Sequence, residues 1–421
     1  MTDTQTLRPD TAQLSADPEA TLPFDPIPTL SVLIGADSLA SRRSGVGRMT
    51  LEIARAARAS AAIDQLGLLL SHGLAGADAL DHLDDPIASP RAVQVVPIPW
   101  KVAIGRVPGV QTLRRIKHGG LNRKVKQMAR SCGGRLVYHE PNMITRPVGL
   151  PTVVTMNDLS WHHEPSWHPA ERLHWIDRNL RSTLKQATRF VAISQFTKDA
   201  VVRDLGIDAK RIDVVPLAPA QEFQPVSAEQ AAAALARYDL ADHGYVFSIS
   251  TIEPRKNFDR LLAAHLRLPP ALRRRAPLVI AGGKGWGSVL SRPEADAAIR
   301  DGTVRLLGHV SDSDLVALCS RAAVFAYVSL YEGFGLPVVE AMATGSPVVA
   351  SSTTAVGELA AGAALLVDPL DETAISEALR CLIEDTKLAE DLRQSGLARA
   401  AEYSWQRTID TLVVSWRRAL D

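Results

Sequence analysis

The sequence predicts an α/β protein built from two doubly wound domains. Short apolar runs rich in valine and isoleucine, such as 29–35, 151–156, 246–249 and 277–281, are typical of buried parallel strands. Helix-like segments separate these runs, and the alternation recurs in the same style on both sides of a proline-containing linker, 216–225. Two such blocks favour two doubly wound domains over a single barrel.

The bulk composition is that of a soluble globular protein. The chain has 421 residues, enough for two or three domains, with 46% hydrophobic and 22% charged residues. A net charge of +1 argues against a dedicated nucleic-acid binder. Its three cysteines are scattered without a Cys-x-x-Cys pair, which indicates a reducing compartment. No apolar run approaches the roughly 20 residues that span a bilayer, so a cytoplasmic location is expected.

Residues 1–27 are polar and carry neither a basic nor an apolar signal region, so we expect a disordered tail. The first domain should follow at 28–218. Its remaining strands are expected at 66–70, 93–96, 135–138, 189–193 and 211–215. Ser194 should cap the helix that ends at Leu205.

A glycine pair stands where the first strand should pass into a helix at 49–59. Gly45 and Gly47 lie at this junction, but Thr50 replaces the third glycine of a dinucleotide fingerprint, so a nicotinamide site is not favoured. The motif alone favours a simple tight turn. A loop that faces a diphosphate or an acceptor is the alternative.

The segment 101–130 is strongly basic. It contains nine lysines and arginines and no acidic residue, with apolar residues interspersed. This composition suits an anionic membrane surface or a pyrophosphate-linked acceptor, but a solvated loop and helix face explains it equally well. The segment has no aromatic platform for nucleic acid.

Two polar residues follow predicted strands of the first half. His139 follows 135–138, and Asp158 comes shortly after 151–156. Parallel sheets place ligands at the carboxyl ends of their strands, so both are candidate site residues. A lone histidine is nevertheless more often a hydrogen-bonded loop residue. The histidines between positions 162 and 174 match no zinc signature, and we expect a loop beside an acceptor there.

In the second half, Arg255 and Lys256 lie between a strand and a helix expected at 258–266. Two adjacent cations at this place suit a diphosphate, although such a pair taken alone is usually solvated surface. Asp312 and Asp314 form an Asp-x-Asp pattern. It fits the first turn of a helix better than a metal site, so no metal is predicted.

The most informative stretch is 329–347. It follows an apolar run at 322–328, turns through Gly333 and Gly335, and enters a helix at Leu336. A strand, a glycine turn and a helix N-terminus together suit phosphate or sugar oxygens, because the free N–H groups and the positive end of the helix dipole point at the ligand.

Two glutamates flank this turn. Glu332 precedes it, and Glu340 lies about one turn into the helix, where its carboxylate could accept two hydrogen bonds from a ribose diol. The spacing, with GFGLP between the two, resembles the Glu-x7-Glu signature of retaining glycosyltransferases of family 4. The HEPN run that begins at His139 is similar to a stretch in bacterial mannosyltransferases of that family. Asn157 departs from the histidine that related sequences commonly carry.

The resemblance implies the GT-B fold, in which two Rossmann-like domains face a central cleft and a C-terminal helix crosses back to the first domain. It makes 219–402 the donor domain and 28–218, completed by 403–421, the acceptor domain. Arg255 and Lys256 would hold the diphosphate of the donor. The other implied site residues are Glu340 for the ribose, Glu332, Gly333, Phe334, Gly335 and Leu336 for the sugar, Val310 for the base, His139 beside the transferring sugar, and Asp158, Gly45 and Gly47 on the acceptor side.

The implied reaction is a retaining, metal-independent transfer of a hexose without a cofactor. The leading prediction is mannose, taken from GDP-mannose and passed to a lipid-linked or polysaccharide acceptor in envelope or exopolysaccharide synthesis, at the inner face of the plasma membrane. A UDP-sugar or rhamnose transferase is the alternative within this fold. A non-catalytic nucleotide-sugar binding module and a dinucleotide oxidoreductase are the alternatives of other classes.

Overall fold

The computed structural model describes residues 29–41, 45–71, 73–81, 110–287, 289–291 and 293–421. The tail predicted at 1–27 and the strand predicted at 93–96 lie outside these residues. The part of the basic segment before residue 110 lies outside them as well.

The first domain surrounds a sheet of seven strands within the described residues, in the order β3-β2-β1-β4-β5-β6-β7. Neighbouring strands are parallel except β2 and β3. The strands are β1 (Leu30–Gly35), β2 (Ile63–Leu70), β3 (Gly73–Gly76), β4 (Leu136–Glu140), β5 (Thr152–Met156), β6 (Arg189–Ala192) and β7 (Ile212–Val214). The helices are α1 (Gly45–Ala59), α3 (Val110–Ser131), α4 (Ser160–His163), α5 (Ala170–Gln186) and α6 (Gln195–Leu205).

The second domain surrounds a parallel sheet, for which the described residues give the order β10-β9-β8-β11-β12-β13. Numbered from β8, this is the 3-2-1-4-5-6 order of the Rossmann fold. The strands are β8 (Val246–Ile249), β9 (Leu278–Ala281), β10 (Val304–Gly308), β11 (Val324–Tyr327), β12 (Val348–Ser351) and β13 (Leu365–Val367). The helices are α7 (Ala228–Arg237), α8 (Phe258–Leu266), α9 (Pro270–Arg275), α10 (Pro293–Arg300), α11 (Asp312–Ser320), α12 (Leu336–Ala343), α13 (Thr354–Ala360), α14 (Glu372–Glu384) and α15 (Thr386–Ala400).

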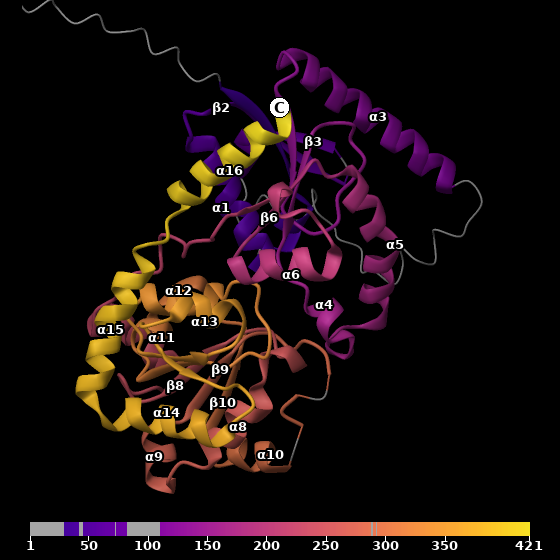
Figure 1. Ribbon diagram of the computed structural model, residues 1–421. Coiled ribbons are helices and arrows are strands. Elements are labelled where there is room, and N and C mark those ends of the chain that lie inside the picture. Colours follow the sequence, from indigo (N-terminus) through magenta and orange to yellow (C-terminus); the bar gives the residue numbers. More distant parts are fainter. Residues whose placement is uncertain (1–28, 42–44, 72, 82–109, 288, 292) are drawn as a thin grey trace, which may run out of the picture.

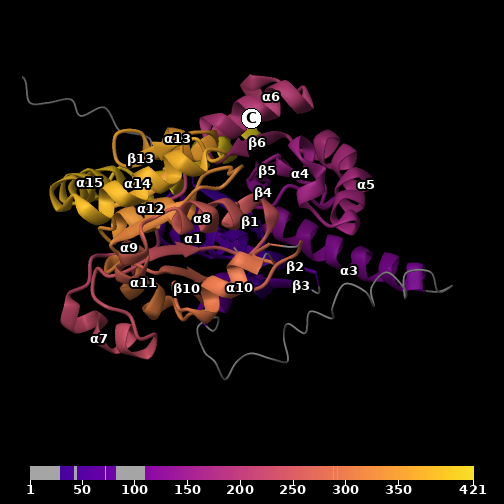
Figure 2. The same cartoon turned by 90° about the horizontal axis from the view of Figure 1, so that it is seen from below.

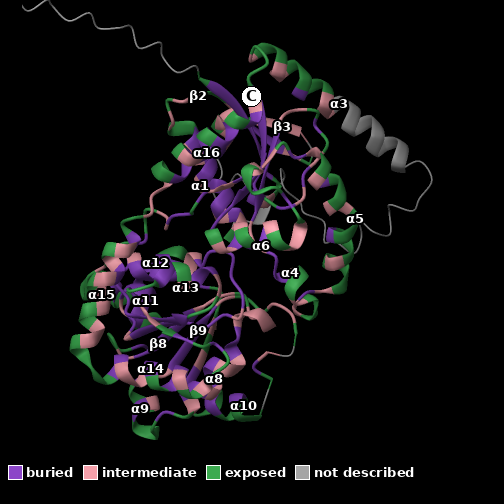
Figure 3. Cartoon of the chain, viewed as in Figure 1, coloured by how far each residue is buried: buried purple, intermediate pink, exposed green. Residues whose placement is uncertain are grey.

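The apolar strands are buried because helices cover both faces of each sheet (Figures 1 and 2). Strands β1, β4, β5, β9, β11 and β12 are buried at every position. Exposed residues gather on the outer faces of the helices (Figure 3). The two-domain fold predicted from the alternating pattern is therefore confirmed.

The last helix, α16 (Trp405–Leu420), crosses back to the first domain, as predicted (Figure 1). It packs against α1 and against β4, β5 and β6, and its Trp416 side chain is fully buried. Trp405 Nε1 donates a hydrogen bond to the carbonyl oxygen of Pro219 (3.1 Å), and Thr408 Oγ1 donates one to that of Pro216 (2.8 Å). These bonds fix the helix to the linker between the domains.

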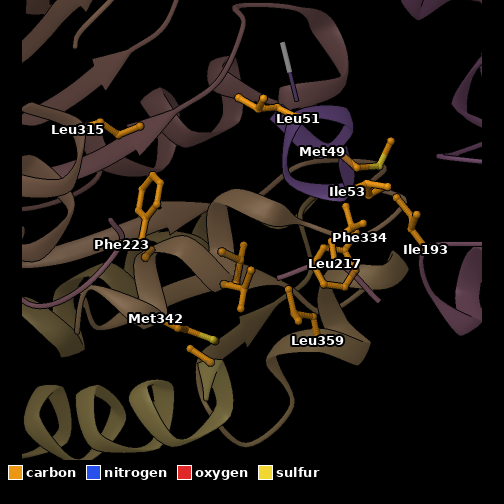
Figure 4. Close-up of a cluster of buried hydrophobic side chains, with 14 of the residues drawn as sticks. Met49, Leu51, Ile53, Ile193, Leu217, Phe223, Leu315, Phe334, Met342 and Leu359 are labelled. Carbon is orange, nitrogen blue, oxygen red and sulfur yellow. The ribbon is translucent and has the colours of Figure 1, made fainter. Parts of the chain in front are cut away.

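A continuous cluster of apolar side chains joins the two domains (Figure 4). It includes Met49 from α1, Phe223 from the linker, and Phe334, Met342 and Leu359 from the second domain. The domains therefore share one core beside the linker.

One predicted strand bound is wrong in a way that affects the candidate site, whereas the predicted helix start at the Asp-x-Asp pattern is confirmed. Strand β4 extends to Glu140, so His139 lies inside the strand and not after it. Pro141, which has no N–H to donate, ends the strand there. Helix α11 begins at Asp312, and Ser311 caps it by accepting a hydrogen bond from the backbone N–H of Asp314.

Helix α3 carries the described part of the basic segment. The side chains of Arg123, Lys124, Lys126 and Arg130 are exposed on it. Within the described residues, no helix combines the length and the apolar character needed to cross a bilayer.

Candidate active site

The predicted donor residues meet at the switch point of the second sheet, between the carboxyl ends of β8 and β11, which are neighbours in the sheet. The loop after β8 carries Arg255 and Lys256, and the loop after β11 carries Glu332. Asn257 Nδ2 donates a hydrogen bond to the carbonyl oxygen of Val328 (2.9 Å), which ties the first loop to the end of β11.

Arg255, Lys256 and Glu332 form one buried charged cluster. Lys256 Nζ lies 2.6 Å from Glu332 Oε1, and Arg255 Nη1 lies 3.0 Å from Glu332 Oε2. Tyr327 Oη also donates to Glu332 Oε1 (2.9 Å). Glu253 accepts a further hydrogen bond from Arg255 Nη2 (2.8 Å). The sequence thus predicted the members of the cluster, but the direct pairing of the two cations with Glu332 is a finding of the structure.

The electrostatics of the cluster favour the ionised carboxylate. Burial raises the pKa of Glu332, but Lys256 and Arg255 outweigh that effect and hold the pKa at about 2. The pKa of Lys256 is lowered by burial and by the neighbouring Arg255 guanidinium, against the attraction of Glu332. The site therefore holds two cations close together, and the carboxylates of Glu332 and Glu253 balance their charge.

The glycine turn after Glu332 lies directly against the first domain. Ser194 Oγ and Thr197 Oγ1 both donate hydrogen bonds to the carbonyl oxygen of Gly333, at 2.7 and 3.1 Å. A Cβ atom on Gly333 would overlap the carbonyl oxygen of Asn157, so the close approach requires glycine. Gly335 then takes a φ of +99° as the N-cap residue of α12.

Glu340 lies on α12 and is 5% exposed. Burial raises its pKa to about 8, although Arg48 acts in the opposite direction. Arg48 Nη1 lies 3.4 Å from Glu340 Oε1, and Arg48 also forms an ion pair with Asp312. Sequence reasoning missed Arg48, which directly follows Gly47 in the glycine-containing junction.

His139 lies near the carboxyl end of β4, inside the strand. Its side chain is fully buried among the strands, where Nε2 lies 2.8 Å from Thr155 Oγ1 and the ring contacts Trp416 edge-on. Burial lowers the pKa of this histidine to about 3. It therefore packs beside α16, and its predicted place beside the transferring sugar stays a prediction.

The remaining predicted residues lie near the domain junction. Asp158 accepts hydrogen bonds from the backbone and hydroxyl of Ser160, at 3.0 and 2.8 Å. Gly45 begins α1, and Gly47 is buried in its first turn. Val310 is buried one residue before the N-cap of α11. The neighbouring Phe334 and Leu336 flank Gly335, and the Phe334 ring contacts Tyr403.

The Asp-x-Asp carboxylates serve ion pairs. Asp314 accepts from Arg237 at 2.5 Å, and Asp312 pairs with Arg48. Among the described residues, no group of three or more histidine, cysteine or acidic side chains is arranged to hold a metal ion. Metal independence stays a prediction.

Two Rossmann-like domains, with the charged cluster at the switch point of the second sheet, place this protein in the GT-B fold class. Among solved structures, that of Anabaena Alr3699/HepE in complex with UDP and glucose aligns with a TM-score of 0.65 at 19% identity, over 91% of this chain and 98% of that one. The structure of WaaG, a glycosyltransferase involved in lipopolysaccharide biosynthesis, aligns with a TM-score of 0.62 at 14% identity, over 91% and 98%.

Sequence comparison identifies the family. The model of glycosyl transferases group 1 matches residues 239–399, and that of glycosyltransferase family 4 matches 43–218. The O-antigen chain mannosyltransferase B of Escherichia coli is 36% identical over 270 residues, which cover 64% of this chain and 71% of that protein. The serotype-specific mannosyltransferase WbdA of Escherichia coli is 29% identical over 58% of this chain and 30% of its own length. This chain belongs to the group 1, family 4 glycosyltransferases, and it is an enzyme that transfers a sugar in glycan synthesis.

Proposed function

We propose that this glycosyltransferase moves mannose from GDP-mannose to a lipid-linked or polysaccharide acceptor, with retention of configuration and without a metal ion. The observation that carries the donor part is the buried cluster in which Arg255 and Lys256 share one carboxylate, Glu332. The choice of mannose rests on the similarity to O-antigen mannosyltransferase B.

The cluster suits a leaving diphosphate. When a donor binds, its phosphate oxygens take hydrogen bonds from Arg255 and Lys256, and charge-assisted bonds of this kind are strong in a buried site. The carboxylate of Glu332 is then available to the sugar hydroxyls, and Glu340 accepts from the ribose diol. Before the donor binds, the ion pairs with Glu332 keep Arg255 and Lys256 in place.

The reaction proceeds by attack of an acceptor hydroxyl oxygen on the anomeric carbon, from the face that the diphosphate leaves. The new C–O bond forms as the bond to the phosphate oxygen breaks, and the electron pair of that bond leaves with the diphosphate. The hydroxyl proton passes to a phosphate oxygen. Arg255 and Lys256 neutralise the negative charge that develops on the leaving group, and the contacts of Ser194 and Thr197 with Gly333 help to exclude water.

A donor panel tests this function. The protein is incubated with GDP-mannose, UDP-glucose, UDP-N-acetylglucosamine and dTDP-rhamnose, each with a set of octyl glycoside acceptors and with EDTA. We expect fast release of GDP and an α-mannoside product, identified by NMR, at a rate that EDTA does not change. Preferential UDP release would replace the donor assignment, a β-mannoside would refute retention, and loss of activity in EDTA would refute metal independence.

We also propose peripheral contact between the basic segment and an anionic membrane at the cytoplasmic face. The exposed cations of α3 support this, because lysine and arginine near an anionic surface each contribute about 1 kcal/mol to binding. Replacing Lys124 and Lys126 with glutamine should weaken sedimentation with phosphatidylglycerol vesicles at low salt but leave transfer to a soluble acceptor unchanged. Unchanged sedimentation would exclude the contact.

A further inference from the structure

A buried carboxyl group lies at the switch point of the first sheet, outside the donor cluster. Glu140 is the last residue of β4, which pairs with β1, and β1 ends at Gly35. The chain becomes exposed within two residues of each strand end, at Asp37 and Asn142. In doubly wound sheets, ligands bind at this place.

Glu140 is only partly satisfied by the protein. Its side chain is 9% exposed, Oε2 accepts a hydrogen bond from Tyr138 Oη (2.7 Å), and Oε1 accepts one from the backbone N–H of Asn142 (3.3 Å). Burial raises the pKa of Glu140 to about 7 against these two hydrogen bonds, and no cation of the described residues contributes to that shift. A carboxylate offers about four acceptor positions, so about two remain open.

Gly35 leaves the space that this carboxyl group occupies. A Cβ atom on Gly35 would lie 2.8 Å from Glu140 Oε2 and 3.0 Å from Tyr138 Oη. A side chain at position 35 would therefore displace the carboxyl group. The end of β1 is shaped to hold an acid at the end of β4, although burial of an unpaired acid is unfavourable for folding.

A short chain of contacts links Glu140 to the donor turn. Asn157 Nδ2 donates a hydrogen bond to the carbonyl oxygen of Pro141 (3.1 Å), and the backbone of Asn157 lies directly against Gly333. Pro141 and Asn157 thus connect Glu140 to the glycine turn at Gly333.

We propose that Glu140 binds the acceptor sugar: its open lone pairs accept hydrogen bonds from acceptor hydroxyl groups and orient the one that attacks the donor. This inference rests on the proposed function, because it takes the acceptor to be a carbohydrate. The ligand class is a saccharide end that presents neighbouring free hydroxyl groups.

Kinetics of matched variants test this role. Glu140→Gln removes the charge, Gly35→Ala keeps the carboxyl group but displaces it, and Glu171→Gln changes an exposed carboxylate of the same domain as a control. Each is assayed with the donor and the octyl glycoside that the wild type uses best. Donor hydrolysis without acceptor and the thermal unfolding midpoint are measured in parallel.

The expected result is a fall in kcat/KM for the acceptor of roughly 10- to 100-fold in Glu140→Gln and in Gly35→Ala. Donor KM and donor hydrolysis should stay within about twofold of the wild type, and the control should match the wild type. Unchanged acceptor kinetics would overturn the inference, as would equal losses in transfer and hydrolysis. If Glu140→Gln does not fold, Gly35→Ala decides. If the wild type uses a different donor sugar, the mannose assignment fails, but the comparison of variants is still read with that donor.

Discussion

Replacing Glu332 with glutamine should destabilise the enzyme in the absence of a ligand. The same substitution should strengthen binding of a nucleoside diphosphate. The substitution keeps the size of the side chain and removes the anion that faces both cations of the cluster. Arg255 retains Glu253 as a partner, whereas Lys256 loses its ion-pair partner in a site where its side chain is 9% exposed. Removing one partner of a buried ion pair costs about 3–5 kcal/mol.

The lowered pKa of Glu332 gives a second value for the free energy that this carboxylate contributes to stability, and it is of similar magnitude. Folding lowers it from 4.5 to about 2, and at about 1.4 kcal/mol per unit this corresponds to roughly 3 kcal/mol of stability. Because the folded-state pKa is depressed, the contribution is present above pH 4.5 and is lost as the pH falls from there towards 2. The wild type should therefore lose stability more steeply than Glu332→Gln in this acidic window.

Thermal unfolding with and without GDP measures both effects. The midpoint of Glu332→Gln should fall by roughly 10 °C, at about 2–4 °C for each kcal/mol in a domain of this size. GDP should raise that midpoint by more than it raises the wild type's, because the diphosphate replaces the missing negative charge. Sugar transfer should drop by roughly 100-fold or more, since Glu332 no longer holds the sugar. Glu377→Gln, at an exposed ion pair, is the control. An equal or smaller GDP shift in Glu332→Gln would refute the placement of the diphosphate at Arg255 and Lys256.

Three further predictions concern the domain junction. Gly333→Ala should separate the donor turn from Asn157 and reduce transfer by roughly 100-fold, with a larger radius of gyration by X-ray scattering as the physical check. Glu340→Gln should flatten the dependence of stability on pH. Because folding raises the pKa of Glu340 from 4.5 to about 8, the wild type loses stability as the pH rises between these values. Thermal unfolding midpoints of both proteins, recorded from pH 5 to 8, would show the difference. Trp416→Ala should cost about 3–5 kcal/mol in chemical denaturation, since the ring is fully buried against His139.

The local features of the fold could be read from the sequence. Helix α8 has the predicted bounds, 258–266, because an apolar stripe and flanking polar residues mark both of its ends. Ser194 was identified as an N-cap from residue type and position, and it accepts the expected hydrogen bond. Such features depend on neighbours within a few residues, and a sequence displays those directly.

The misread features depend on contacts between distant residues or on a strand end. Arg48 and Glu340 are 292 positions apart, and no local pattern links them. His139 was placed directly after a strand at 135–138, whereas β4 continues to Glu140, the residue before Pro141.

The interface between the two domains passes through the candidate site. Residues of the first domain therefore contact the glycine turn at Gly333, which belongs to the second domain. Glu358 of α13 accepts hydrogen bonds from the backbone N–H groups of Gln195 (3.2 Å) and Phe196 (3.0 Å), at the free N-terminus of α6. The same helix start carries Thr197 and its cap Ser194, which hold the Gly333 carbonyl. If the two domains separated, all of these groups would lose their hydrogen-bond partners together. The contacts therefore couple the geometry of the glycine turn to the position of the first domain. We therefore predict that the proposed donor site is complete only when the first domain is in contact with Gly333.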